Sequence, residues 1–89
     1  MKLNEILDQV KLDQLKANLD DFFKFYRESS YNIDSDTNKN YISIVATSTS
    51  PSPLNKLKRR FADAEKYGAI ITLSGKKLII QLPKSYFEK

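Results

Sequence analysis

Four cations crowd into one short segment of this 89-residue chain. The stretch SPSPLNKLKRRF, residues 50–61, holds Lys56, Lys58, Arg59 and Arg60 within five positions. If the segment is helical, Lys56 and Arg59 share an outward face, and Lys58 and Arg60 lie on its two flanks. Cations gathered on one helix face suit the phosphates of a nucleic acid, because phosphate contacts depend on charge and not on base sequence.

Further polar residues extend this predicted anion site. Ser50 and Ser52 stand just before the predicted helix, where hydroxyl and amide groups can donate to a phosphate. A hairpin turn in the sequence SGKK carries two more lysines at its tip. The predicted nucleic-acid-binding residues are Ser50, Ser52, Lys56, Lys58, Arg59, Arg60, Lys66, Lys76 and Lys77.

A solvated helix face explains the same charges without any ligand. Asp63 lies four residues after Arg59 and three before Lys66, so each cation has a partner within the helix. Lysines at a turn also discourage unwanted pairing of strand edges. At the level of sequence both interpretations stay open.

The distribution of charge favours an anionic partner. Residues 1–50 hold six basic and eight acidic side chains, a net charge of −2, whereas residues 51–89 hold nine basic and three acidic, a net charge of +6. The positive charge therefore belongs to the second half of the chain, and such asymmetry is typical of proteins that bind polyanions.

The residue types present exclude several kinds of site. The chain has no cysteine and no histidine, so it lacks disulfides, thiolate nucleophiles and the commonest general base and metal ligand. Its carboxylates, lysines and tyrosines show no catalytic spacing, and we expect no enzymatic activity and no cofactor. Residues 34–40 begin like a calcium loop, but Lys39 replaces the required glycine and Val45 the required glutamate, so we expect no metal.

The chain is short enough for one domain, residues 1–89. Glu5 and Asp8 interrupt the N-terminal segment, which excludes a signal-peptide core there. The longest wholly apolar run is three residues, far short of the roughly 20 that a membrane span needs. We therefore expect a cytoplasmic protein without a membrane partner.

A long helix is predicted over residues 2–28, which contain no glycine or proline. Its apolar residues form two stripes about half a turn apart. The first is Leu3, Ile6, Leu7 and Val10, and the second is Leu12, Leu15, Leu19, Phe22, Phe23 and Tyr26. Either the helix breaks near residues 11–13, or each stripe meets a different partner.

The remaining pattern predicts a loop over residues 29–40, a strand over 41–46, a helix over 53–67 and a hairpin over 69–82. Ser52 is the predicted cap of the second helix, Pro53 its first residue and Gly68 its end. A two-residue turn at Gly75–Lys76 sets the hairpin register.

The fold class is therefore α+β, with two layers. An N-terminal helix precedes a β-α-β-β unit, and helices cover one face of a three-stranded sheet. If the strands that flank the second helix are parallel, their connection is right-handed. Residues 84–89 form a short tail.

Two functions fit this pattern. The first is a small nucleic-acid-binding protein that uses residues 53–67 and the hairpin tip. The second is a protein-interaction module, with residues 1–12 as an oligomerisation helix or with the mixed sheet face as a dimer interface. That face is Tyr41, Ser43, Val45, Ile70, Thr72, Ile79 and Gln81.

Overall fold

The computed structural model describes residues 9–87 as a single four-stranded sheet with helices packed on it. The elements in chain order are α1 (Gln9–Phe23), β1 (Ser29–Asp34), β2 (Tyr41–Ser48), α2 (Pro51–Arg60), the 3-10 helix η2 (Ala62–Tyr67), β3 (Ile70–Ser74), β4 (Lys77–Pro83) and the 3-10 turn η3 (Lys84–Phe87). The strand order is β1-β2-β4-β3, and all neighbouring strands are antiparallel. The α+β class is confirmed, but the sheet has four strands where three were predicted.

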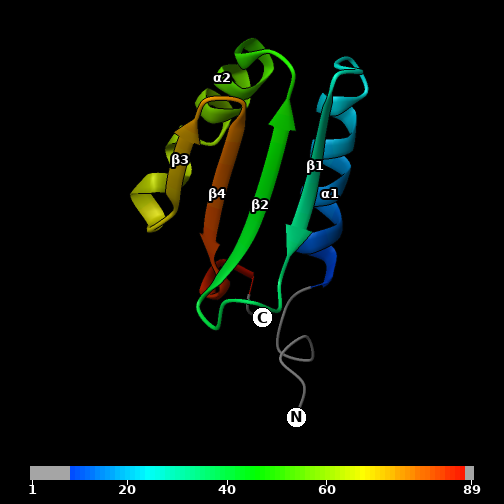
Figure 1. Cartoon of the computed structure of the whole chain (residues 1–89). Coiled ribbons are helices and arrows are strands. Elements are labelled where there is room, and N and C mark those ends of the chain that lie inside the picture. The colour runs from blue at the N-terminus through cyan, green and yellow to red at the C-terminus, as the bar shows by residue number, and fades with distance from the viewer. Residues whose placement is uncertain (1–8, 88–89) are drawn as a thin grey trace.

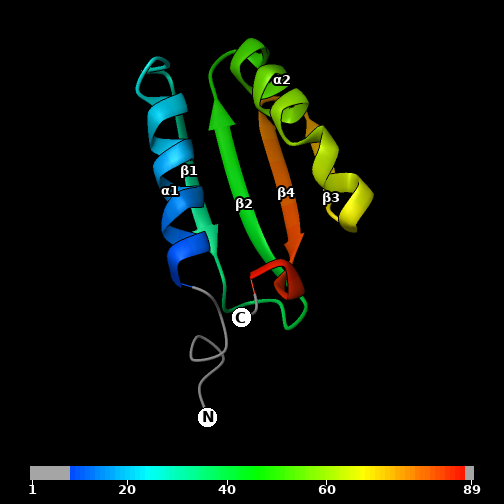
Figure 2. The ribbon, with the colours of Figure 1, turned by 180° about the vertical axis from the view of Figure 1, so that it is seen from behind.

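Both helices lie on the same face of the sheet (Figure 1). The main contacts of α1 are with β1 and η3, whereas α2 packs on β2, β3 and β4. Since β2 and β3 each pair antiparallel with β4, they run in the same direction with β4 between them. Viewed from the helix side, β3 lies to the right of β2, so the connection through α2 is right-handed, as expected (Figure 2).

The strand β1 lies inside the segment predicted to be a loop, and that prediction is wrong for residues 29–34. Only Tyr31 and Ile33 are apolar there, and both are partly buried against the core. The Tyr31 ring packs 5.2 Å from the Phe23 ring of α1, and the hydroxyl of Ser29 donates to that of Ser48 at 2.7 Å. Pairing with β2 thus makes a strand of a polar segment that has little strand propensity of its own.

α1 is continuous through Lys11–Asp13, so the predicted break is absent. Asp13 does not cap a second helix; its carboxylate accepts a hydrogen bond from the Gln9 amide at 3.0 Å within the same helix. Val10 is 63% exposed, on a different side from the buried Leu15 and Leu19. Val10 is the described member of the first stripe, and the other members, Leu3, Ile6 and Leu7, lie outside the described residues.

α2 begins two residues earlier than predicted, with Ser50 as its cap residue and Pro51 as its first residue. It also ends early, because the backbone leaves the α-helical form at Phe61 and continues as η2. Leu54 and Leu57 are fully buried, as their positions on the helix predicted. Gly68 ends η2 at φ 99°, a left-handed conformation that favours glycine.

The hairpin has the predicted register, with Leu73 opposite Leu78 and Ile71 opposite Ile80. Gly75 has φ 61°, and no non-glycine residue of 9–87 has a positive φ, which fits the predicted type II′ turn. The core between the sheet and the helices is apolar. Its fully buried members include Ile42, Ile44, Leu54, Leu57, Leu78 and Ile80.

The segment that follows β4 returns to this core. The amide of Lys84 donates to the Asn40 carbonyl at 2.8 Å, and the Phe87 side chain is fully buried. Residues 84–87, which the sequence marks as part of a short tail, therefore close one end of the layer between sheet and helices.

Candidate functional site: the basic face of α2 and the groove beside it

The cations of α2 have no ionic partners among residues 9–87. Lys56, Lys58, Arg59 and Arg60 are all exposed, and the ion pairs in this part of the chain are Lys24–Asp21 and Lys66–Asp63. The Arg59–Asp63 pair considered from the sequence does not form. The helical geometry changes at Phe61, between the two residues, so the spacing of an α-helix no longer applies.

The four cations divide around α2. Lys56 and Arg60 point toward α1, where the Lys56 ammonium lies 5.7 Å from the centre of the Tyr26 ring and the Arg60 guanidinium 5.8 Å from that of Phe22. Lys58 and Arg59 border a shallow hollow on the outer side of the helix, together with Ser52. α2 therefore presents positive charge over most of its exposed circumference.

The N-terminus of α2 is a poor phosphate cradle, contrary to the expectation from the serines. Of the four N–H positions that an α-helix leaves unbonded here, from the cap residue Ser50 to Pro53, Pro51 and Pro53 have no N–H, and the Ser50 N–H donates to the Ser48 hydroxyl at 3.2 Å. Only Ser52 can offer a backbone donor there. The contribution expected from Ser50 and Ser52 thus reduces to their hydroxyls and one amide.

The other predicted cations lie at separate places. Lys76 is next to the start of α2, because its carbonyl accepts the Ser48 N–H at 3.1 Å. Lys77 pairs with Thr47 and Ser74 and alternates with the buried Leu78, so its side chain lies on the face away from α2. Lys66 lies beyond the bend at Phe61, 3.9 Å from the Asp63 carboxylate. The structure therefore gathers the four α2 cations and separates Lys66 and Lys77 from them.

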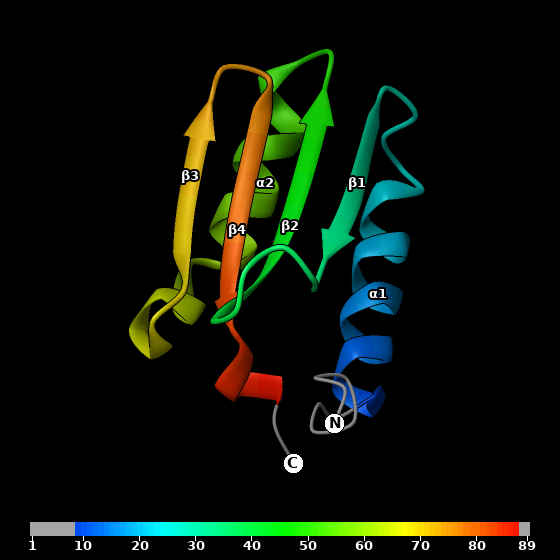
Figure 3. The same ribbon diagram turned by 60° about the horizontal axis from the view of Figure 1, so that its bottom comes forward.

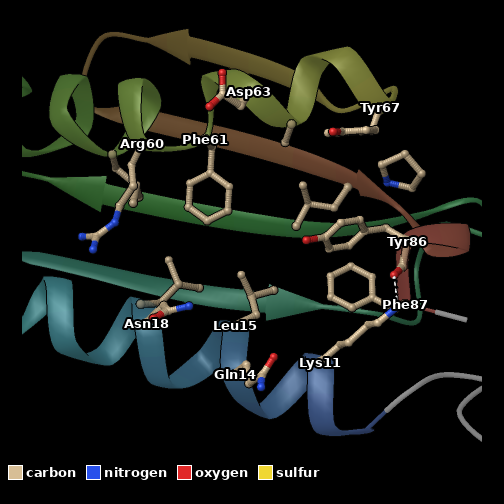
Figure 4. Close-up of a pocket in the computed structure, with 15 residues that line it drawn as sticks. Lys11, Gln14, Leu15, Asn18, Arg60, Phe61, Asp63, Tyr67, Tyr86 and Phe87 are labelled. Atoms are coloured by element: carbon tan, nitrogen blue, oxygen red, sulfur yellow. Dashed lines mark hydrogen bonds between the residues drawn. The ribbon is translucent and has the colours of Figure 1, made fainter. Parts of the chain in front are cut away.

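A groove of about 620 Å³ lies between α1 and α2 (Figure 4). α1 packs on β1, and α2 on β2, β3 and β4 (Figure 3), and the side chains that line the groove come from both helices, η2, β4 and η3. Leucines from both helices and from β4 form its floor, and Phe61 points into it. The lining residues are Lys11, Gln14, Leu15, Asn18, Leu19, Leu57, Arg60, Phe61, Asp63, Ala64, Tyr67, Leu82, Pro83, Tyr86 and Phe87.

The two ends of the groove differ. At one end Arg60 reaches toward α1 (Figure 4). At the other end the Lys11 ammonium donates to the Tyr86 carbonyl at 3.2 Å, and the Tyr86 ring packs edge-on against Phe87 at 5.1 Å. Sequence reasoning did not find this groove, because Tyr67 and Tyr86 fall in segments read as a helix end and a tail. The available signal was the presence of aromatic residues in these largely polar segments.

The mixed sheet face is not covered by any helix of the described residues (Figure 3). Tyr41, Ser43, Val45, Ile79 and Gln81 on this face are half-buried by their neighbours, while Ile70 is 45% exposed. α1 packs on the opposite face of the sheet and does not cover this one.

Two residues of β1, Tyr31 and Asp34, have altered pKa values. Burial, followed by the hydrogen bond to the Asp20 carboxylate, raises the pKa of Tyr31 to about 12. The hydrogen bond from the Thr37 hydroxyl, then those from the Asp36 and Thr37 amides, lowers the pKa of Asp34. These hydrogen bonds fix the start of the loop that follows β1. The described residues contain no cluster of acidic side chains able to hold a metal ion.

No helix within residues 9–87 has the length and apolar character to cross a membrane. No protein-family model, curated protein or solved structure matches this chain. The basic face of α2 and the adjoining groove are therefore its candidate functional surface on geometry and charge alone.

Proposed function

We propose that this chain is a small, non-enzymatic nucleic-acid-binding protein whose phosphate-contacting surface is α2. The observation that carries the proposal is the set of four exposed cations in ten residues, with no acidic side chain in α2 and no ion pair to any described residue. An unpaired surface cation keeps its full attraction for phosphate, whereas a paired one must first give up its partner.

The position of each residue supports a defined footprint. Lys56 and Arg60 contact the nucleic-acid backbone from the side of α2 that faces α1. Arg59 and Lys58 extend this contact around the outer side of the helix. Lys76 and the Ser52 hydroxyl add to it at the N-terminal end of α2. Lys66 and Lys77 lie outside this footprint, and their substitution has a smaller effect.

Titration of oligonucleotides at two salt concentrations tests the proposal. With about four phosphates neutralised, the logarithm of affinity falls against the logarithm of salt concentration with a slope of roughly −3 to −4. Each of the substitutions Lys56→Ala, Arg59→Ala and Arg60→Ala reduces the slope by about 1.

The matched controls are Lys16→Ala on the exposed side of α1 and Lys39→Ala in the loop between β1 and β2. Both remove one exposed cation from another part of the surface and leave the slope unchanged. Absence of binding at low salt, or an equal loss for the control variants, would contradict the proposal.

A second candidate function is pairing between two copies of the chain through the mixed sheet face. The supporting observation is that Ile70, 45% exposed, shares this face with the half-buried Val45 and Ile79. Sedimentation velocity at high protein concentration tests it. We expect a dimer that Ile70→Lys converts to a monomer; a wild-type monomer at every concentration would contradict pairing.

A further inference from the structure

We propose that the groove between α1 and α2 takes unstacked bases of a single-stranded nucleic acid whose backbone lies along the α2 cations. This inference rests on the proposed function above and goes beyond it, because it assigns the groove and the strand type. It predicts recognition of base surfaces that a duplex keeps stacked inside.

The first support is the aromatic lining. Phe61 and Tyr67 lie at the two ends of η2, Tyr86 lies in η3, and all three border the groove. Tyr67 is 75% exposed and Tyr86 is 56% exposed, so two of the rings offer large surfaces to a ligand. Bases stack on such rings in proteins that bind single strands, with little dependence on base identity.

The second support is that part of this lining is already held in position. The Tyr86 ring packs at 80° against Phe87, which is fully buried, and the Lys11 ammonium lies 5.8 Å from the centre of the Tyr86 ring. The hydrogen bond from Lys11 to the Tyr86 carbonyl joins η3 to α1. A ring held in this way loses little conformational freedom when a base stacks on it.

The third support is the charge that adjoins the groove. Arg60 belongs both to the groove lining and to the basic face of α2, and it forms no ion pair with a described residue. A backbone bound along α2 therefore passes the open end of the groove. Beyond Phe61, η2 carries the two carboxylates of Asp63 and Glu65 against the one ammonium of Lys66, so the nucleic-acid backbone follows α2 and not η2.

Size and polarity fit the same ligand. A volume of about 620 Å³ falls within the range of roughly 300–1,000 Å³ typical of ligand sites. Gln14 and Asn18 on the α1 side carry amides that can donate to and accept from base edges. The floor of buried leucines matches the apolar face of a base and offers nothing to a phosphate.

The decisive probe is an abasic strand. We compare a single strand of about 12 thymidines, the same length of uridines, an abasic deoxyribose-phosphate strand and a duplex. The wild-type chain should bind the base-containing single strands roughly 10-fold or more tightly than the abasic strand or the duplex.

Tyr67→Leu and Tyr86→Leu should each remove most of this preference and leave the affinity for the abasic strand unchanged. Arg59→Ala should weaken binding of all four probes by similar factors. The matched aromatic control is Phe25→Leu, which removes a ring that is 73% exposed and lies outside the groove, and it should change nothing. Circular dichroism establishes that each variant is folded.

The outcomes separate this inference from the proposed function. If all probes bind equally and the tyrosine variants match the wild type, while Arg59→Ala still weakens binding, the groove does not take bases and the proposed function stands. If no probe binds at low salt, both are overturned. Binding of the base-containing strands that Phe25→Leu reduces as much as Tyr67→Leu would also overturn the assignment to the groove.

Discussion

The two helices cover the same face of the sheet but are attached to it differently. Pro53, Leu54 and Leu57 anchor α2 in the core, and Lys56 and Arg60 add contacts with the rings of Tyr26 and Phe22. α1 buries its own apolar stripe and also forms two hydrogen bonds to other elements. The Tyr31 hydroxyl donates to the Asp20 carboxylate, and the Lys11 ammonium donates to the Tyr86 carbonyl.

Their outward faces differ as well. On α1 the Lys24 ammonium lies 2.9 Å from the Asp21 carboxylate, and this contact lowers the pKa of Asp21, with a smaller contribution from Arg60. On α2 none of the four cations forms an ion pair with a described residue, and Arg60 acts on Asp21 only from beyond ion-pair distance. Because buried Leu54 and Leu57 attach α2 to the sheet, its exposed cations need not form ion pairs to hold the helix in place. Those cations are therefore available to a ligand.

The largest expected effect is on the attachment of α2. Leu57→Ala removes a fully buried side chain and should lower the free energy of unfolding by about 3–5 kcal/mol. Leu12→Ala on α1, at a partly buried position, should cost less than half of that because its site already meets solvent. Chemical denaturation measures both; equal losses would show that the two helices are attached with similar strength.

A smaller effect, of opposite sign, concerns η3 at the end of β4. The Lys84 side chain is buried and its ammonium has no hydrogen-bond partner among the described residues. Lys84→Met keeps the packing and removes an ammonium that lacks a hydrogen bond. This gain exceeds the loss of its attraction for the Asp34 carboxylate, the smallest of the influences on the pKa of Asp34, so the free energy of unfolding should rise by roughly 1–2 kcal/mol. Lys39→Met, an exposed control on the neighbouring loop, should have no effect. A less stable Lys84→Met variant would mean that the ammonium is satisfied in solution.

The smallest effect is a pH dependence of the contact between α1 and β1. The pKa of Tyr31 is raised to about 12, above its ordinary value of 10.0, so the folded chain favours the protonated phenol. The stabilisation it gives is fully present below pH 10 and is lost as pH rises from about 10 through 12. Tyr31→Phe should show a weaker fall in melting temperature over this range than the wild type.

Tyr41→Phe is the control for that measurement, since Tyr41 alternates with the buried Ile42 in β2 and therefore lies on the mixed sheet face, away from α1. Identical melting curves of wild type and Tyr31→Phe from pH 9 to 12 would contradict a role for the Tyr31–Asp20 contact.

The elements that were predictable are those whose residues act locally. The hairpin followed from its alternating apolar pattern and from Gly75, because only one register places Leu73, Leu78, Ile71 and Ile80 on a common face. The buried side of α2 followed from the spacing of Leu54 and Leu57. The strand β1 could not be predicted from its own residues, because Tyr31 and Ile33 are buried against the core and hydrogen-bonded to β2, which other parts of the chain supply.

The candidate site divides in the same way. That Lys56, Lys58, Arg59 and Arg60 share one exposed helix was a property of the sequence, since helical spacing alone puts them outside an apolar stripe. The sequence could not show whether Arg59 pairs with Asp63. That depended on the change of helical geometry at Phe61, which separates the two residues.

The sequence by itself determined the two-layer α+β class, the hairpin register and the concentration of positive charge on one helix. These depend on periodicity and composition, which are local. The tertiary structure alone decided that Lys77 faces away from α2, that η3 brings Tyr86 opposite Lys11, and that a groove lined with aromatic rings adjoins the basic face. Such placements depend on which strands pair and how far two helices stand apart, and those distances are fixed only when the whole chain packs.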